Sequence, residues 1–564
     1  MTAIATTGRA RWGDRLVGYP AERADRYRRG GAWTDLPLAE RLRAIAARHP
    51  DRPAVVSAQE SVTFHELDTR TDRIAAGLAR LGLEPGDPVI FQVTNRIETV
   101  YAWYGCIKAG LIPVATLAAH RAHEIGHIVG KVGAVAHLVE GGTSFDLVGF
   151  AREQADGHPT LRHIITIGVA RQHATVPLES LGDDIAVDEA RAVVDRIQAG
   201  IDPLDVVAFQ LSGGTTGVPK VIPRLHVEYW NNALFYARRL GWDEHTRVAH
   251  LIPLIHNAGI TCGLHAPHSV GGCLILATAD TATAFPLLAQ ARATDVLIGH
   301  GHYQALLSSE FDEPRRYLRR IVLSGAKPTY SLFERADAGT GRWAGQLFGM
   351  SEGLFTVTPL DAPTAARFGT VGTPVSDDDE IRILEPGGDT ELAEGVVGEL
   401  TCRGPYTICG YFDAGDHNRA AFTAEGFYRT GDLAKIAVID GQRYLVIEGR
   451  IKDLINRGGE KINAEEVELL LVRHPNIADA AVVAMPDPRL GERTCAYLVA
   501  ADGFALTMSE VQQHLESLGV AKFKWPERLE WRTVFPQTNV GKIDKRRLRS
   551  DIGEKLAAEN EECS

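Results

Sequence analysis

The chain has 564 residues, too many for a single hydrophobic core, so we expect two or more domains. Hydrophobic residues make up 45% and charged residues 23%, as in ordinary globular proteins, and the net charge of −12 argues against nucleic acid as a partner. The sequence contains no apolar run of the ~18–20 residues that a membrane span needs and begins with no apolar signal segment. Seven scattered cysteines without zinc-ligand spacing favour reduced thiols, so we expect a cytoplasmic protein.

The first third of the chain alternates helical and strand patterns. Residues 63–78 are typical of a helix, 88–93 of a strand, 98–110 of a helix and 111–116 of a strand. Residues 205–210 predict a further buried strand, and the same alternation recurs over 248–277 and 293–324. This rhythm indicates α/β architecture, with largely parallel sheets covered by helices.

Beyond residue 369 the character changes to short strands, predicted over 380–384, 398–402 and 444–447. We therefore expect a small β-rich subdomain that completes a large N-terminal domain of layered αβ subdomains. A new α+β pattern begins after residue 449, with a helix predicted over 465–473. We place the domain boundary at Arg450, which gives a core domain of residues 1–449 and a C-terminal domain of residues 450–564.

A glycine-rich segment, residues 211–220, follows the strand predicted at 205–210. Glycines allow backbone N–H groups to approach an anion closely, and hydroxyl and ammonium groups add donors and charge. The segment lacks the contiguous Gly-Lys-Ser/Thr of a Walker A loop, and an ordinary turn is the alternative interpretation. The residues that make it a candidate phosphate-binding loop are Ser212, Gly213, Gly214, Thr215, Thr216, Gly217 and Lys220.

Four further segments, at residues 346–353, 428–432, 449–462 and 536–545, combine glycines with charged or aromatic residues. Together with 211–220, and in this order, they closely resemble the motifs of the adenylate-forming superfamily, which includes acyl-CoA synthetases, nonribosomal-peptide adenylation domains and firefly luciferases. Residues 256–257, 403–406 and 456–462 more narrowly resemble the stand-alone aryl-acid adenylating enzymes of siderophore and aryl-capped peptide pathways. The resemblance covers nearly the whole chain.

The resemblance implies ATP and Mg²⁺ as cofactors, activation of a carboxylate to an acyl-adenylate, and transfer of the acyl group to a thiol. It assigns Lys542 to the substrate carboxylate and α-phosphate, Glu352 to Mg²⁺, and Lys452 to a hinge about which the C-terminal domain rotates between the half-reactions. With Lys542 and Glu352, the catalytic set includes Thr215 and Lys220. The predicted nucleotide contacts are Ser212, Gly213, Gly214, Thr215, Thr216, Gly325, Phe348, Gly349, Met350, Ser351, Asp432 and Arg450, with Phe348 stacked on adenine and Asp432 on the ribose hydroxyls. A solvated lysine, a capping glutamate and a plain turn aspartate are the alternatives for Lys542, Glu352 and Asp432.

The acyl pocket implied by the resemblance consists of His256, Asn257, Cys262, Gly325, Ala326, Phe355 and Lys542. Asn257 would bond the carboxylate or ortho-hydroxyl of an aryl acid, and an uncharged pocket disfavours α-amino acids, because a buried unpaired ammonium is costly. Cys262 stands where dihydroxybenzoate-activating relatives carry serine. A thiol is the weaker hydrogen-bonding group, so we expect salicylate or a methyl-substituted salicylate as substrate. 2,3-Dihydroxybenzoate and other hydroxylated or heteroaromatic acids stay open as alternatives.

The identity of the acyl acceptor is inferred from the length of the segment after Lys542. Only residues 543–564 follow it, too few for a carrier domain. We therefore expect a separate phosphopantetheinylated aryl carrier protein as partner, and an aryl-CoA ligase is the alternative. A luciferase-like oxidase and a non-catalytic binding module are less favoured: no oxygen-handling site is evident, and Lys542, Glu352 and Asp432 are all present.

Overall fold

The computed structural model describes residues 9–169, 172, 174–212, 219–457, 460–501, 503, 505–538 and 542–562. The chain divides into two compact units. The first comprises Met1–Glu380 and Cys402–Tyr428, and the second comprises Ile381–Thr401 and Arg429–Ser564.

A seven-stranded sheet forms one layer of the first unit, in the order β7-β6-β5-β3-β4-β8-β9. Its strands are parallel except for β9, which pairs antiparallel with β8. All six residues of β3 are buried, as expected of a parallel strand covered on both faces. The strands are β3 (Pro88–Val93), β4 (Ile112–Leu117), β5 (Ala136–Glu140), β6 (His163–Ile167), β7 (Thr175–Pro177), β8 (Val206–Leu211) and β9 (Val221–Leu225).

A nine-stranded sheet forms the second layer of this unit, in the order β16-β15-β14-β13-β12-β10-β11-β1-β2. It is parallel from β1 to β14, and β2, β15 and β16 run antiparallel to their neighbours. Its strands are β1 (Pro53–Val56), β2 (Ser61–Thr63), β10 (Arg247–His250), β11 (Cys273–Leu276), β12 (Asp295–Gly299), β13 (Arg320–Ser324), β14 (Trp343–Gly349), β15 (Phe355–Val357) and β16 (Thr373–Pro374).

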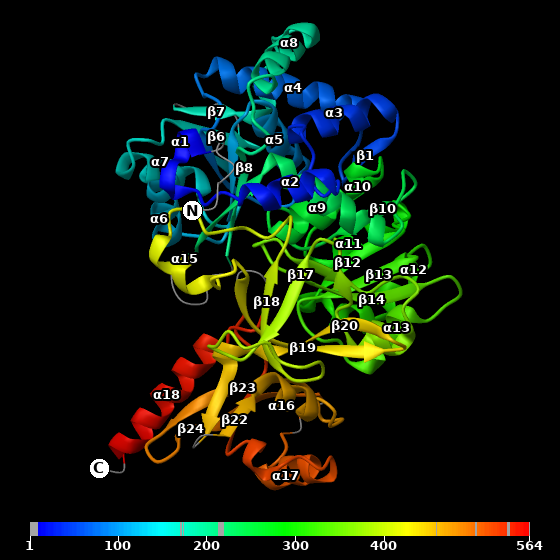
Figure 1. Cartoon of the computed structure of the whole chain (residues 1–564), viewed down its shortest axis with the longest axis vertical. Coiled ribbons are helices and arrows are strands. Elements are labelled where there is room, and N and C mark those ends of the chain that lie inside the picture. The colour runs from blue at the N-terminus through cyan, green and yellow to red at the C-terminus, as the bar shows by residue number, and fades with distance from the viewer. Residues whose placement is uncertain are drawn as a thin grey trace. The chain divides into compact units, whose positions relative to one another are not determined.

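Helices α3 (Leu38–Arg48), α4 (Phe64–Arg80) and α5 (Ile97–Lys108) pack side by side in the first unit (Figure 1). Thr63 begins α4 with a capping box, in which Thr63 and Glu66 satisfy each other's backbone N–H groups. The buried ammonium of Lys108 joins α5 to α4, since it lies 2.5 Å from Asp68 and 2.6 Å from Asp72. Loss of one partner from such a pair leaves a buried charge uncompensated, so it would lower the stability of the fold.

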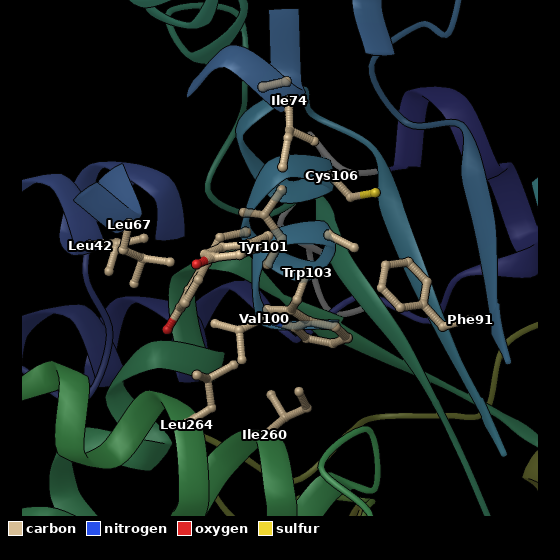
Figure 2. Packing of buried hydrophobic residues seen from close by; sticks show 14 of the residues in the cluster. Leu42, Leu67, Ile74, Phe91, Val100, Tyr101, Trp103, Cys106, Ile260 and Leu264 are labelled. Carbon is tan, nitrogen blue, oxygen red and sulfur yellow. The ribbon is translucent and has the colours of Figure 1, made fainter. Parts of the chain in front are cut away.

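The main hydrophobic core lies between α5 and its neighbours, where Figure 2 shows Val100 and Trp103 of α5 close to Ile260 and Leu264. The last two belong to η3 (Gly259–His265), a π-helical turn that leads into α10 (Ala266–Ser269). Buried apolar side chains thus hold η3 in place. The remaining longer helices of this unit are α2 (Ala21–Arg29), α6 (Ala122–Val132), α7 (Leu147–Gly157), α8 (Val187–Gln198), α9 (His226–Arg239), α11 (Thr281–Gln290) and α13 (Tyr330–Asp337).

The second unit contains most of a four-stranded sheet, β17-β18-β19-β20, and a sheet in the order β22-β21-β24-β23, with β25 added beside β24. Helix α18 (Lys545–Glu562) packs against β23, and α16 (Ala464–Leu471) contacts both β23 and α17 (Met508–Ser517) (Figure 1). The strands are β17 (Glu380–Leu384), β18 (Gly398–Arg403), β19 (Tyr428–Ile439), β20 (Gln442–Arg450), β21 (Leu454–Arg457), β22 (Glu460–Asn463), β23 (Ile477–Asp487), β24 (Gly491–Ala500) and β25 (Arg528–Arg532).

The division between the units differs from the predicted domain boundary. Residue 450 ends β20, and β20 pairs along its length with β19, so a single sheet holds the chain on the N-terminal side of that residue. Residues 381–401 and 429–449 therefore belong to the second unit instead of the first. The boundary at 449/450 stays a prediction about where the C-terminal residues rotate.

Candidate active site

The glycine-rich segment begins where β8 ends. The Ser212 N–H donates to the Lys220 carbonyl at 3.0 Å, and the Lys220 N–H donates to the Ser212 hydroxyl at 3.0 Å. The Lys220 ammonium lies 5.3 Å from the centre of the Tyr411 ring. The two ends of the segment are thus joined at its base. The other candidates here, Gly213, Gly214, Thr215, Thr216 and Gly217, lie outside the described residues.

The end of β14 and the turn that follows it carry five of the predicted nucleotide and metal residues: Phe348 and Gly349 end the strand, and Met350, Ser351 and Glu352 lie in the turn to β15. Backbone hydrogen bonds between Met350 and Leu354, and between Gly353 and Met350, close it. Gly353 has φ +127°, and a Cβ at that position would lie 1.5 Å from the Tyr406 carbonyl oxygen, so only glycine fits. The turn is therefore held against the segment around Tyr406.

Glu352 is 7% exposed, and its carboxylate accepts a hydrogen bond from the Tyr411 hydroxyl at 2.5 Å. That hydroxyl also lies 2.8 Å from the Tyr428 hydroxyl. Burial, followed by the Glu352 charge, raises the pKa of Tyr411, so the phenol keeps its proton and acts as a donor. Tyr411 was missed as a functional residue, because a tyrosine in a segment of mixed polarity carries no motif.

The predicted acyl residues Asn257, Cys262 and Phe355 are all buried, with exposed fractions of 2%, 1% and 1%. Cys262 and Phe355 belong to one hydrophobic cluster, which Leu347 shares. Burial raises the pKa of the Cys262 thiol, so it is uncharged. The Phe355 ring lies across Gly349, where a Cβ would come within 2.6 Å of it. The acyl candidates and the predicted adenine-binding turn therefore meet.

Asn257 connects these two parts directly. Its side-chain oxygen accepts from the Tyr229 hydroxyl at 2.9 Å, and its side-chain nitrogen donates to the Met350 carbonyl at 3.3 Å. His256, beside it, is half-buried, and its Nδ1 accepts from the Ala258 N–H at 3.3 Å.

The remaining first-unit candidates, Gly325 and Ala326, directly follow β13. Gly325 has φ +95°, a left-handed conformation that favours glycine, and the Ala326 carbonyl accepts from the Tyr303 hydroxyl at 2.8 Å. They lie at the carboxyl end of a parallel strand, the usual place for ligand contacts in such sheets.

Helix α9 and the strand before it contribute buried polar groups that carried no motif in the sequence. Arg224 and Glu228 form a fully buried ion pair at 2.7 Å, and Arg224 also donates to the Ser351 carbonyl at 3.0 Å. Asn232 donates to the Gly353 carbonyl at 3.2 Å. The available signal was that Arg224, Glu228 and Asn232 are polar residues set among apolar ones, because buried polar side chains need partners.

The second unit holds the other predicted residues. Asp432 is 4% exposed, and Arg450 Nε lies 2.8 Å from its carboxylate. Burial raises the pKa of Asp432, and Arg450 and Lys542 oppose the rise. Lys452 reaches solvent, yet partial desolvation and repulsion from Arg450 lower its pKa to about 8. Lys542 is exposed, and its carbonyl accepts a hydrogen bond from the Thr538 N–H at 2.7 Å. Asp432, Arg450 and Lys542 thus form one charged group within this unit.

Comparison with known proteins identifies both parts of the chain. The family model described as "AMP-binding enzyme" matches residues 42–412, and the one described as "AMP-binding enzyme C-terminal domain" matches residues 466–542. The chain is 40% identical to "Pyochelin synthase PchD" of Pseudomonas aeruginosa over 97% of its own length and 98% of that protein. It is 37% identical to "Salicylyl-CoA synthase / salicylate adenylyltransferase" of a Streptomyces species, over 95% and 97% of the two chains.

Among solved structures, the apo structure of MbtA from Mycobacterium smegmatis matches with a TM-score of 0.71 and 34% identity, over 95% of this chain and 99% of that one. The mixed α/β fold with a large and a small part is thereby confirmed. Among the helices of the described residues, none combines the length and apolar character needed to cross a bilayer.

Proposed function

Because the chain belongs to the AMP-binding enzyme family of adenylate-forming ligases, we propose that it uses ATP to convert a salicylate-like aryl acid to aryl-AMP. We further propose that it passes the aryl group to the phosphopantetheine thiol of a separate aryl carrier protein. The relative named for salicylate adenylation supports the first step, and the relative named for pyochelin synthesis supports a role in siderophore assembly.

The proposed reaction has two steps. A carboxylate oxygen of the acid attacks the α-phosphorus of ATP, the bond from that phosphorus to the bridging oxygen breaks, and pyrophosphate leaves. A thiolate then attacks the acyl carbon of the adenylate and AMP leaves, the thiol proton passing to solvent. Negative charge gathers on the phosphate oxygens in the first step, so positioned cations and N–H donors supply most of the rate enhancement.

We assign the phosphate contacts to the glycine-rich segment, with Ser212, Gly213, Gly214, Thr215 and Thr216 as donors and Lys220 as the charge. The adenine and phosphate contacts of the first unit are completed by Phe348, Gly349, Met350, Ser351 and Gly325. The two hydrogen bonds between Ser212 and Lys220 support this assignment, because they hold the two ends of the segment together where β8 ends.

Glu352 is the proposed Mg²⁺ ligand. Its buried carboxylate, oriented by the Tyr411 hydroxyl, is the hard oxygen donor that Mg²⁺ prefers, so the residues present fit the ion. When bound, Mg²⁺ neutralises charge on the phosphates. The chain's own contribution is to fix the direction of the carboxylate through the Tyr411 hydroxyl.

In the second unit we assign Asp432 to the ribose hydroxyls, Arg450 to the nucleotide, Lys542 to the reacting oxygens and Lys452 to the hinge. The ion pair of Asp432 with Arg450, and the electrostatic effect of Lys542 on Asp432, support a shared role for these three groups. A rotation about one residue at the end of an element is a known means of closing an active site.

One observation supports a salicylate-like acid as the substrate: a single buried amide side chain lies beside buried apolar side chains. Asn257 supplies the polar contact, while Cys262 and Phe355 are buried in a hydrophobic cluster, so the site suits a flat aromatic ring with one polar substituent beside its carboxylate. His256 and Ala326 complete the proposed acid contacts. The thiol at Cys262 favours salicylate or a methylsalicylate over 2,3-dihydroxybenzoate.

ATP–pyrophosphate exchange with salicylate, 6-methylsalicylate, 2,3-dihydroxybenzoate, anthranilate and hydroxypicolinate tests the proposal. We expect the highest kcat/KM with salicylate or 6-methylsalicylate. Exchange with amino or fatty acids and none with these aromatic acids would refute it. An aryl-CoA ligase is the second candidate, because the Streptomyces relative is named as a salicylyl-CoA synthase. Transfer of labelled aryl group to holo-carrier protein or to CoA, measured side by side, decides between them.

A further inference from the structure

The hydroxyl group of Tyr229 lies at the centre of a buried hydrogen-bond network beside the proposed acyl site. Tyr229 is on α9 and is fully buried. Gln210, the penultimate residue of β8, donates to the Tyr229 hydroxyl from its side-chain nitrogen at 3.0 Å. The same hydroxyl donates to the Asn257 side-chain oxygen at 2.9 Å. The Tyr229 hydroxyl therefore connects Gln210 of β8 to Asn257, the residue proposed to bind the acid.

The hydrogen bonds of this network form a consistent chain of donors and acceptors. A phenol has one proton, and because Gln210 donates to its oxygen, that proton points to Asn257. Burial raises the pKa of Tyr229, so the proton stays in place. The Thr261 hydroxyl, 3.4 Å away, is a second donor to the same Asn257 oxygen. The amide oxygen of Asn257 is thus held toward α9 and η3.

The amide nitrogen of Asn257 consequently points the other way. One of its N–H groups donates to the Met350 carbonyl at 3.3 Å. Among the residues that the structure describes, the second N–H has no recorded acceptor. With the amide fixed in this orientation, Asn257 can offer a donor to a ligand and cannot offer an acceptor.

The Tyr229 ring is itself fixed in position. The Arg224 guanidinium lies 4.5 Å from its centre, and the His265 ring packs edge-on at 5.3 Å. Arg224 is in turn held by Glu228 at 2.7 Å. A buried tyrosine that only fills space needs one partner for its hydroxyl, whereas this hydroxyl bonds two side chains, one of them a proposed substrate contact.

We propose that Tyr229 is a positioning residue that orients the Asn257 amide as a hydrogen-bond donor to an oxygen at the ortho position of the aromatic acid. The inference rests on the proposed function and adds to it the source of selectivity for an ortho-oxygen substituent. Acids that carry an ortho hydroxyl or phenolate oxygen gain this hydrogen bond, and acids with hydrogen at that position do not.

The test compares salicylate with benzoate in ATP–pyrophosphate exchange, for the wild-type enzyme and for Tyr229→Phe. The substitution keeps the ring and removes only the hydroxyl, so the Asn257 oxygen loses its 2.9 Å hydrogen bond and keeps only the longer one from Thr261 at 3.4 Å. We expect the salicylate-to-benzoate ratio of kcat/KM to fall about 3- to 12-fold, the value of one neutral hydrogen bond. The fall should appear mainly in KM for salicylate, with KM for ATP changing less.

Tyr104→Phe is the matched control. It also removes a buried phenol, 2.8 Å from His268 Nδ1, but that group does not contact Asn257. Its ratio should equal that of the wild type. If Tyr229→Phe does not fold, Gln210→Met, which removes the donor that directs the phenolic proton, should lower the ratio in the same direction by a smaller factor.

The outcomes separate the two claims. A wild-type enzyme that prefers salicylate, with an unchanged ratio in folded Tyr229→Phe or, failing that, in Gln210→Met, overturns the role of Tyr229 and leaves the proposed function standing. An equal fall in Tyr104→Phe also overturns it, because the effect would then be general to buried phenols. A wild-type enzyme without activity on any hydroxybenzoate removes the proposed function, and the inference with it.

Discussion

Replacement of Cys262 by serine is the sharpest test of how the acid is chosen. Cys262 is 1% exposed on the π-helical turn η3, and it shares a hydrophobic cluster with Phe355 and Leu347. Serine is nearly the same size as cysteine, so Cys262→Ser changes hydrogen-bonding capacity with little change in volume. The buried neighbours that anchor η3, Ile260 and Leu264, are untouched (Figure 2).

The expected magnitude follows from where the new hydroxyl lies. A serine hydroxyl buried without a hydrogen-bond partner costs about 1–3 kcal/mol of binding free energy, and a hydrogen bond from a ring hydroxyl of the acid contributes about 0.5–1.5 kcal/mol. Salicylate has no hydroxyl at the 3-position to meet it, whereas 2,3-dihydroxybenzoate has one. The kcat/KM ratio of 2,3-dihydroxybenzoate to salicylate should therefore rise by about 1–2 kcal/mol, or about 5- to 30-fold. The lower end applies where serine bonds a carbonyl one turn back on η3.

The assay is ATP–pyrophosphate exchange with each acid varied at saturating ATP. Cys273→Ser is the matched control, because Cys273 is 3% exposed on β11 and belongs to no proposed acyl contact. Its acid ratio should stay at the wild-type value. A ratio that does not move in Cys262→Ser, or that moves equally in Cys273→Ser, would refute the assignment of Cys262 to the acyl pocket.

Three further predictions concern catalysis and stability. Lys542→Ala should slow adenylate formation by ~10²-fold or more, because one preorganised charge at the transition state is lost. Lys522→Ala, which removes another exposed lysine of the second unit, should leave the rate unchanged. ATP–pyrophosphate exchange near the wild-type rate in Lys542→Ala would exclude the assigned role. Tyr411→Phe should raise the Mg²⁺ concentration for half-maximal exchange about 10-fold, because Glu352 loses its orienting donor, and an unaltered Mg²⁺ titration would count against Glu352 as the ligand. Asp68→Asn should lower the free energy of unfolding at pH 7 by about 3–5 kcal/mol. Burial opposes the ionised form of Asp68, but its lysine and arginine partners outweigh it and lower the pKa, so this stabilisation is present above the unfolded value of about 3.9 and is lost as pH falls through the lower folded value. Thermal unfolding against pH should thus be flatter below about pH 4 in Asp68→Asn, and parallel curves would contradict the sign.

Much of the fold could be predicted because its strands are buried on both faces. The pattern at 88–93 coincides with β3, and that at 111–116 is within one residue of β4. A largely apolar hexamer next to a helical pattern is typical of a strand in a parallel sheet covered on both faces. Helix α4 begins directly after Thr63, where the helical pattern over 63–78 was predicted to begin. Local rules determined these elements, so the sequence sufficed.

The division of the chain could not be predicted in the same way. A boundary was expected at Arg450 because a new α+β pattern begins there, and it stays a prediction; the compact units divide earlier in the chain, since β20 pairs with β19 and both lie mostly in the unit of the later strands. Pairing between strands is a long-range property that composition does not report. The polar partners Tyr411 and Tyr229 were missed for a related reason: each acts through one hydrogen bond to a motif residue far away in the chain.

The placement of the candidates separates the residues proposed to choose the acid from one part of the general catalytic set, since Lys220 and Glu352 lie in the first unit with them. Asn257, Cys262 and Phe355 lie in the first unit, whereas Asp432 and Lys542 lie in the second. In the proposed reaction the second group acts on the ribose, the α-phosphate and the carboxylate, which are common to every acid. A substitution there removes stabilisation equally for all acids and leaves their ratios unchanged. A substitution near Asn257 changes the ratios, because it alters contacts that only some acids make. Acid ratios measured across both sets of variants therefore test the assignment of roles without any assumption about how the two units are arranged.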